Sequence, residues 1–431
     1  MTVGIQTDLK QDVLNQLRRA RAVVGSLSQL STDQKNLALQ HMSDALWSSR
    51  ERILAANQAD VADALAAGQS DTRIDRLKLD ETRIQSMMTG LMQISKLPDP
   101  VGERIDSTTL PNGLNVEKVR VPLGVIAIVY ESRPNVTVDA AALALKSGNV
   151  AVLRGGKEAR KSNQALVDAL RDGLRRSNVP EDAIQLIQRE EREAVDFLIQ
   201  ATGLVDVAIP RGGSGLIQRV VEQARVPVIE TGVGNCHVYV DARADATKAT
   251  HIVLNAKTQR PSVCNAAETL LVHQGMAESW LPHMLVELQQ MGVEIRGCEQ
   301  TRLYALKAGL DESSVQPATE EDWATEFLAP ILAVKVVANV DEAIDHIHRY
   351  GTLHSEAIVT EDAVVAEQFL SQVDAAVVYH NASTRFTDGF EFGFGAEIGI
   401  STQKIHARGP MGLRELTSYK YIVRGNGQVR E

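Results

Sequence analysis

The sequence predicts an α/β protein with two domains, preceded by a helical N-terminal region. Three observations support this fold class. Short β-rich segments alternate with helical segments from about residue 116 onward, which is typical of parallel sheets covered by helices. The alternation restarts after Cys236, so we expect a second α/β domain. A chain of 431 residues, of which 44% are hydrophobic, is long enough to fill both cores.

The first hundred residues predict helices. Capping signals at Thr7-Asp8 and at Ser31-Thr32-Asp33 are each followed by apolar residues at helical spacing. We therefore expect helices that begin near these two signals.

The α/β regions follow in order. In the first region, the expected strands are 116–121, 125–130, 150–153, 205–209 and 226–229, and the helices are 136–145, 160–176 and 216–224. In the second region, the expected strands are 238–240, 269–272, 332–337, 357–359 and 376–379, with helices at 341–348 and 362–370. The segment 416–423 reads as one more strand, and it has no evident partner nearby in the sequence.

Composition excludes several classes of protein. The net charge of −10 disfavours nonspecific binding to nucleic acid. Three cysteines without CxxC spacing exclude a disulfide scaffold and indicate a reducing compartment. The longest apolar run, 123–130, is too short to cross a bilayer, and the N-terminus lacks the pattern of a signal peptide. We expect a cytoplasmic globular protein.

Cys264 is the candidate nucleophile. It follows the turn-forming residues Gln259–Val263 and stands just before the strand-like segment 268–273. A thiol at a loop–strand junction can face a cleft, and a thiolate there is a strong nucleophile for acyl chemistry. The alternative is a small buried hydrophobic residue, which is the usual fate of a cysteine.

Two glycine-containing turns were compared as phosphate-binding candidates. Gly212, Gly213 and Ser214 lie between a strand and a helix, where backbone N–H groups can approach a phosphate. A tight strand-to-helix turn is the alternative. Gly232 and Gly234 are followed by a strand and not by a helix, so we expect only a turn there.

Four cations form a second anion-binding candidate. They cluster just after the strand 150–153, at the carboxyl end where α/β sheets bind ligands. They are Arg154, Lys157, Arg160 and Lys161. A solvated helix start is the alternative, and it is disfavoured because cations oppose the helix dipole at that end.

Four longer motifs carry a resemblance to a known family. Segments 234–241, 381–389, 394–402 and 404–413 are similar to the gamma-glutamyl phosphate reductase family of the aldehyde dehydrogenase superfamily, and the similarity extends from about Lys118 to Tyr421. This resemblance implies a variant Rossmann cofactor domain (1–104 and 122–233) without the usual glycine fingerprint. It also implies an α/β catalytic domain (234–403) and a small β oligomerisation element (105–121 and 404–431).

The resemblance also assigns roles to individual residues. It implies that Cys264 is the nucleophile and that Asn135 binds the oxyanion. Glu326 matches the residue that holds the nicotinamide ribose, and the turn at Gly212, Gly213 and Ser214 matches the pyrophosphate-binding turn. Together with the basic cluster, in which Arg154 and Lys157 are the candidates, it implies NADPH as cofactor and no metal. Arg154 departs from the lysine that many relatives have.

The activity that the resemblance implies is NADPH-dependent reduction of L-glutamyl 5-phosphate to L-glutamate 5-semialdehyde and phosphate. This is the second step of proline biosynthesis and would proceed through a cysteine thioester. Arg133, Arg260 and Arg385 are candidate partners for the anionic substrate, with ion pairs elsewhere as the alternative. Glu230 matches the base of aldehyde-oxidising relatives, and a phosphate reductase does not need that base.

Two other functions stay open at this point. One is an NAD(P)-dependent aldehyde dehydrogenase that oxidises a semialdehyde, which Glu230 keeps in consideration. The other is a noncatalytic member of the superfamily, against which Cys264, Asn135 and Glu326 argue. The resemblance further implies a homo-oligomer, formed by the hairpin and the C-terminal strand of a neighbour, and a separate glutamate 5-kinase as a transient partner.

Overall fold

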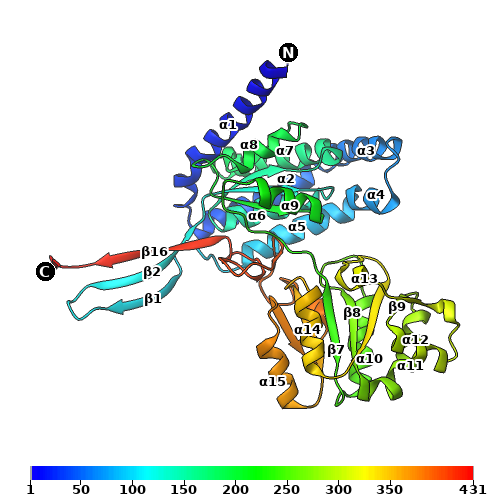
Figure 1. The fold of residues 1–431 in the computed structure, drawn as a ribbon. Helices are drawn as coiled ribbons and strands as arrows, with labels where there is room; N and C mark the ends of the chain where they lie inside the picture. Colours follow the sequence, from blue (N-terminus) through cyan, green and yellow to red (C-terminus); the bar gives the residue numbers. More distant parts are fainter. Residues whose placement is uncertain (1, 431) are drawn as a thin grey trace. The chain divides into compact units, whose positions relative to one another are not determined.

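The computed structural model describes residues 2–430 and divides into two compact units (Figure 1). Unit 1 contains the chain up to Thr231, Gly393–Gly399 and the segment from Met411 onward. Unit 2 contains Gly232–Phe392 and Ile400–Pro410. The chain therefore passes from unit 1 to unit 2 at residue 232, returns to unit 1 at residue 393, enters unit 2 again at residue 400 and ends in unit 1 from residue 411.

Five helices open unit 1. They are α1 (Thr2–Leu27), α2 (Thr32–Ser48), α3 (Arg50–Ala66), α4 (Asp71–Leu77) and α5 (Glu81–Lys96). The predicted start at Ser31 is confirmed, because its hydroxyl accepts from the N–H of Gln34 at 3.2 Å in a capping box. The predicted start at Thr7-Asp8 is wrong. The helix α1 already begins at Thr2, so Thr7 and Asp8 lie inside it.

A four-stranded parallel sheet forms the core of unit 1, in the order β5-β4-β3-β6. Its strands are β3 (Val125–Tyr130), β4 (Val150–Arg154), β5 (Ile184–Leu186) and β6 (Val207–Arg211), and its further helices are α6 (Asn135–Lys146), α7 (Arg160–Arg176), α8 (Glu193–Ile199) and α9 (Ser214–Gln223). The expected strand 226–229 is only an isolated bridge from Val228 to Ala208. Pro227 has no N–H to continue the ladder.

A separate three-stranded antiparallel ribbon belongs to unit 1 and projects from its body (Figure 1). It contains β1 (Arg104–Thr109), β2 (Asn115–Pro122) and β16 (Thr417–Arg424), with β2 in the centre. The predicted C-terminal strand is thus confirmed, and its partner lies about three hundred residues earlier in the chain. Large side chains on the ribbon are exposed, among them Tyr421 and Val423.

Unit 2 is built on a seven-stranded parallel sheet in the order β10-β9-β11-β8-β7-β12-β13. Its strands are β7 (Cys236–Val240), β8 (Ala267–His273), β9 (Glu294–Gly297), β10 (Val315–Pro317), β11 (Ile331–Val337), β12 (Ser355–Val359) and β13 (Val377–His380). The main helices are α10 (Ala246–Thr258), α11 (Gln274–Gln290), α12 (Glu299–Lys307), α14 (Val340–Tyr350) and α15 (Ala363–Gln372), and α13 (Glu320–Ala324) is short. A two-stranded pair, β14 (Ile400–Ser401) and β15 (Gly409–Pro410), completes the unit.

Strand direction places the candidate residues on defined edges of the two sheets. In unit 1, Arg154 and Arg211 end β4 and β6, so they lie at the carboxyl edge, as the sequence predicts for Arg154. In unit 2, Cys264 precedes β8, and Asn235 and His354 precede β7 and β12. Because these strands are parallel, the three residues share the amino edge of the sheet. Within residues 2–430, no helix combines the length and apolarity needed to cross a bilayer.

Candidate active site

Cys264 lies in the turn between α10 and β8 and is half-buried. This is the loop–strand junction expected from the sequence. Gly234 packs closely against this turn, since a Cβ at that position would lie 1.6 Å from the carbonyl oxygen of Cys264. No side chain fits there. The backbone of the Gly232–Gly234 segment therefore packs directly on the peptide of the candidate nucleophile, a role that the sequence alone does not indicate.

The next residue, Asn265, ties the turn to a distant loop of unit 2. Its side-chain amide donates to the carbonyl oxygens of Thr387 at 2.9 Å and Arg385 at 3.3 Å, and the hydroxyl of Thr384 donates to the carbonyl of Asn265 at 2.7 Å. Asn265, Thr384 and Thr387 are all buried. The loop that carries Arg385 is thus fixed relative to Cys264.

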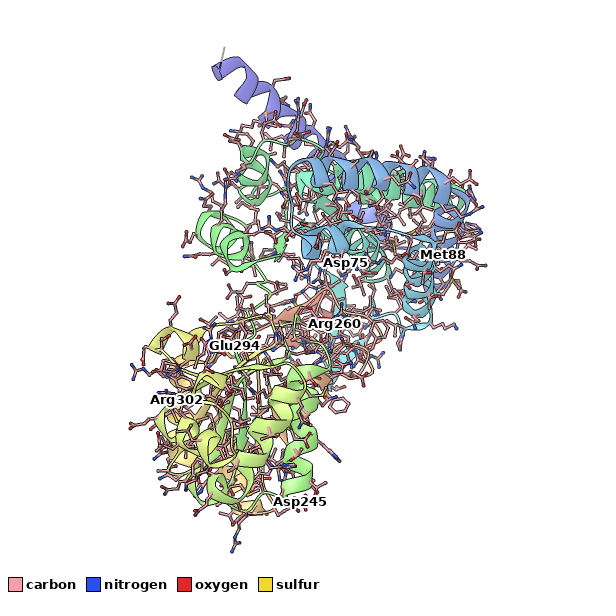
Figure 2. All side chains as sticks on the ribbon, turned by 90° about the vertical axis from the view of Figure 1, so that its right-hand side faces the viewer. Asp75, Met88, Asp245, Arg260, Glu294 and Arg302 are labelled. Carbon is pink, nitrogen blue, oxygen red and sulfur yellow. The ribbon has the colours of Figure 1, made fainter. Side chains whose placement is uncertain are left out.

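Arg260 and Arg385, two of the predicted substrate arginines, belong to unit 2 together with Cys264. Arg260 is exposed and follows the C-terminal end of α10, whereas Asp245 caps the other end of that helix, and the two residues mark opposite ends of the unit in Figure 2. Burial and the neighbouring Arg260 lower the pKa of Arg385, while Asp388 and the thiol of Cys264 act in the other direction. The structure therefore places Arg385 within electrostatic reach of both Cys264 and Arg260, and the binding of substrate by these arginines stays a prediction.

Glu326 also reaches this turn. Its carboxylate accepts the N–H of Gly234 at 2.7 Å, and burial raises its pKa. Nearby, Glu268 at the start of β8 forms an ion pair with Lys257, both fully buried, and accepts the N–H of Leu328 at 3.1 Å. These contacts fix the segment 326–328 beside the peptide that carries Cys264. They show how Glu326 is held within unit 2.

Asn135 and Arg133, the other predicted residues of this group, belong to unit 1. Asn135 is exposed and begins α6, where its side-chain amide donates to the carboxylate of Asp139 at 3.3 Å. Burial raises the pKa of Asp139 to about 6, and the hydrogen bond from Asn135 opposes that rise. An amide nitrogen has two N–H groups, so this bond leaves one for another acceptor. Arg133 is exposed on the loop before α6.

The glycine turn of unit 1 already holds an anionic group of the chain. The N–H of Gly213, the residue that precedes α9, donates to the carboxylate of Glu131 at 3.0 Å. A Cβ at Gly212 would lie 2.7 Å from the carboxyl carbon of Glu131, so a larger residue there would displace this carboxylate from the turn. Backbone N–H groups at the start of a helix attract negative charge. The turn is therefore suited to an anion, as its sequence indicates.

The four cations after β4 are not equivalent. Lys161 pairs with Asp63 at 2.7 Å, and Arg160 pairs with Glu190 at 3.1 Å. Arg154 is half-buried, donates to the carbonyl of Gly155 at 2.8 Å, and has a buried Nε without a hydrogen-bond partner. Lys157 is exposed and has no ion pair among the residues that the structure describes. Together with the segment 186–190, Arg154, Lys157 and Arg160 line a hollow at the carboxyl edge of the unit 1 sheet, whereas Lys161 does not line it.

Comparison with known proteins places this architecture in a family. The model of the aldehyde dehydrogenase family matches residues 2–307. The chain belongs to the aldehyde dehydrogenase family. It is 58% identical to gamma-glutamyl phosphate reductase of Carboxydothermus hydrogenoformans over 97% of this chain and 99% of the relative. It is 56% identical to the protein of that name from Clostridium kluyveri over 98% of this chain and all of the relative.

A solved structure gives the same result for the fold. The crystal structure of gamma-glutamyl phosphate reductase from Thermotoga maritima matches with a TM-score of 0.94 at 50% identity, covering 97% of this chain and 100% of that chain. The predicted membership of the aldehyde dehydrogenase superfamily and the predicted α/β fold are therefore confirmed.

Membership of the aldehyde dehydrogenase family implies a nicotinamide cofactor, and the residues of unit 1 fit one. A dinucleotide carries phosphate groups, which need N–H donors and cations. The N–H of Gly213 already donates to a carboxylate, and Arg154, which lines the hollow, has a buried Nε without a hydrogen-bond partner. Among the described residues, no group of three or more His, Cys, Asp or Glu side chains is arranged to hold a metal ion.

Sequence reasoning missed the residues that support the nucleophile. Asn265 is adjacent to Cys264, but its partners are about 120 residues away, so local sequence gives no indication of its role. Cys236 was identified only as one of three cysteines. Gly234 was interpreted as a turn, and the tight packing that requires glycine there became visible only in three dimensions.

Proposed function

We propose that this chain catalyses the NADPH-dependent reduction of L-glutamyl 5-phosphate to L-glutamate 5-semialdehyde and phosphate, the second step of proline biosynthesis from glutamate. Curated relatives with 54–58% identity over almost the whole chain bear the name of this activity. The observation that carries the proposal is the half-buried thiol of Cys264 within electrostatic reach of the Arg385 guanidinium, which is itself influenced by Arg260. An acyl phosphate requires both a nucleophile and cations that accept the departing phosphate.

In the first half-reaction, the Sγ of Cys264 attacks the acyl carbon. A carbon–sulfur bond forms, the bond from that carbon to the phosphate oxygen breaks, and phosphate leaves with the electron pair. Arg260 and Arg385 stabilise the charge on the phosphate by charge-assisted hydrogen bonds. The amide of Asn135 and a backbone N–H beside Cys264 stabilise the oxyanion of the tetrahedral species.

In the second half-reaction, the bound nicotinamide supplies the hydride that reduces the thioester. Cys264 then departs as a thiolate when the thiohemiacetal collapses to the semialdehyde. Neither step consumes water, so Glu230 has no role as a base for hydrolysis. The second candidate activity, oxidation of a semialdehyde to a free acid, does require such a base.

In the same proposal, unit 1 binds the cofactor and unit 2 carries the thiol. Gly212, Gly213 and Ser214 bind the pyrophosphate through the start of α9. Lys157 and Arg154 select NADPH by contact with the 2′-phosphate, and Lys157 is the better candidate of the cluster because Arg160 and Lys161 already have carboxylate partners. Glu326 holds the nicotinamide ribose.

We also propose that the chain forms a homo-oligomer through the ribbon of β1, β2 and β16. Both β1 and β16 are edge strands, and an unpaired edge is a site for adding a strand of another copy. A separate glutamate 5-kinase, which would supply the labile acyl phosphate, is a transient partner in this scheme. Sedimentation of the intact chain and of a variant lacking residues 417–424 tests the role of the ribbon.

One assay separates the candidate activities. Reduction of NADP is followed with glutamate 5-semialdehyde in the presence and absence of phosphate or arsenate. The proposal expects turnover that requires either anion, and intact-mass spectrometry should detect an acyl adduct that is lost in Cys264→Ala. Turnover without either anion would identify a hydrolytic aldehyde dehydrogenase, and full activity of Cys264→Ala would exclude the thioester route.

A further inference from the structure

A second thiol lies beneath the candidate nucleophile. The S–H of Cys236, at the start of β7, donates to the carbonyl oxygen of Cys264, with 3.2 Å between sulfur and oxygen. Cys236 is fully buried, and burial raises its pKa well above the ordinary value, so this thiol keeps the proton that it donates. It is therefore a permanent neutral donor to the peptide of Cys264.

We propose that Cys236 is a positioning residue that fixes the peptide of Cys264 during catalysis. The inference rests on the proposed role of Cys264 as nucleophile. The carbonyl oxygen of Cys264 accepts from the Sγ of Cys236 and packs against the backbone of Gly234, where a Cβ would lie 1.6 Å from it. Gly234 and Cys236 thereby limit the rotation of the peptide between Cys264 and Asn265. They also limit the direction of the N–H group of that peptide, which is the backbone donor beside Cys264 in the proposed mechanism.

A buried hydrogen-bonded chain supports the thiol from behind. The Sγ of Cys236 lies 3.7 Å from Nδ1 of His354, which lies 2.8 Å from the hydroxyl of Ser355. That hydroxyl is 2.7 Å from the hydroxyl of Thr387, on the loop bound by Asn265. Burial lowers the pKa of His354 to about 4, so this series of hydrogen-bonded side chains is uncharged at neutral pH. A neutral, fully buried support fixes geometry without changing the charge beside Cys264.

The expected effect follows from the worth of one hydrogen bond. Removing the donor deletes the hydrogen bond from Cys236 to the carbonyl of Cys264 and loosens the peptide. A neutral hydrogen bond contributes roughly 0.5–1.5 kcal/mol, which corresponds to about a 2- to 13-fold change. We therefore expect Cys236→Ala to lower kcat by about 3- to 10-fold. The KM for NADPH and the rate at which iodoacetamide alkylates Cys264 should change less than twofold, because neither depends on the oriented N–H group.

Three variants separate positioning from packing. Cys236→Ser keeps a donor and should recover kcat to within about twofold of the parent chain, since a hydroxyl replaces the thiol. Cys236→Val fills the space without a donor and should behave like Cys236→Ala, which also covers the case that the alanine variant does not fold. Cys298→Ala is the matched control. Cys298 is a half-buried thiol of unit 2 whose contacts, with Thr301 and Val336, do not involve Cys264.

The results have defined meanings. Unchanged kcat in both Cys236→Ala and Cys236→Val would overturn the proposal. A Cys236→Ser variant that is as slow as Cys236→Val would also overturn it. So would a loss of kcat that is accompanied by equal losses in NADPH affinity and in the rate of alkylation, and that also occurs in the Cys298→Ala control. Cys264→Ala is assayed in parallel. If it retains turnover, the proposed function fails independently, whereas an inactive Cys264→Ala with a fully active Cys236→Val refutes only the positioning role.

Discussion

Replacing Gly234 with alanine is the sharpest steric test of the active-site geometry. The added methyl group would lie 1.6 Å from the carbonyl oxygen and 2.5 Å from the carbonyl carbon of Cys264. Non-bonded contacts to a Cβ essentially never fall below 3.0 Å, so the two backbones must separate by more than an ångström. Both are main-chain segments, and no side-chain rotation relieves the contact. Cys264 therefore moves, and the N–H of Gly234 moves relative to Glu326.

A misplacement of about 1 Å in a catalytic group costs roughly 100-fold in rate. We expect Gly234→Ala to lower kcat/KM by at least that factor, and overpacking to reduce the free energy of unfolding by about 1–3 kcal/mol. The assay combines steady-state kinetics, NADPH binding by fluorescence and thermal unfolding. NADPH binding should be retained to the extent that it depends on unit 1.

Two control variants accompany this test. In Gly232→Ala, the new methyl group would lie 2.3 Å from Cγ2 of Thr402, a side-chain atom and not the main chain that carries Cys264, so a smaller loss of kcat is expected. In Gly25→Ala, within α1, nothing lies within 4 Å of the new methyl group, and a helix interior favours alanine. A Gly234→Ala variant that unfolds at the same temperature as the parent chain, and whose kcat is within threefold of the parent value, would refute the expected displacement of Cys264.

Three further predictions follow from contacts elsewhere in the chain. Asn135→Ala should lower kcat by about 10²–10³-fold with little change in melting temperature; a large drop in melting temperature with preserved kcat would assign Asn135 to the start of α6 instead. Lys157→Ala should raise the Kd for NADPH by about 10- to 150-fold and leave the Kd for NADH unchanged. Lys161→Ala is the matched control, because Lys161 already pairs with Asp63. An equal loss of affinity for NADPH and NADH in Lys157→Ala would contradict the assignment. His346 is buried, and burial lowers its pKa to about 2, so between pH 6.5 and 4.5 the unfolded chain binds a proton that the folded chain does not, and stability falls as the pH falls. Urea unfolding should show that His346→Phe removes up to about 2.7 kcal/mol of this loss, and parallel pH curves for the two proteins would refute the role of His346.

Sequence reasoning predicted the elements whose signals are local. The helix 160–176 and the strand 125–130 have the same bounds in the structure, because their apolar spacing and flanking residues are sufficient. Short strands such as β9 and β10 were missed, since four and three residues give little periodicity. The pairing of β16 with β2 joins segments about three hundred residues apart, and no local pattern encodes it.

The candidate site divides in the same way. Cys264 was identifiable because a thiol between turn residues and a strand is a local pattern, and the position of Arg154 followed from the end of β4. The neighbours of Cys264 were not identifiable. Gly234 and Cys236 approach it through a parallel strand pair, and Asn265 reaches a loop far along the chain. Support of this kind depends on tertiary contacts, which a single sequence does not specify.

The position of Cys264 on the sheet explains why arginines surround it. Reactive thiolates commonly lie at the N-terminal end of a helix, where the dipole stabilises negative charge. Cys264 instead follows the C-terminal end of α10 and precedes β8, so the nearby helix end contributes a negative potential. Positive charge must come from side chains. Arg260 directly follows that helix end, and Arg385 is fixed beside it by the Asn265 contacts and by a hydrogen bond from its Nε to Gln259 at 2.9 Å. In the proposed mechanism, the two guanidinium groups that bind the acyl phosphate would therefore also offset the helix dipole for the Cys264 thiolate.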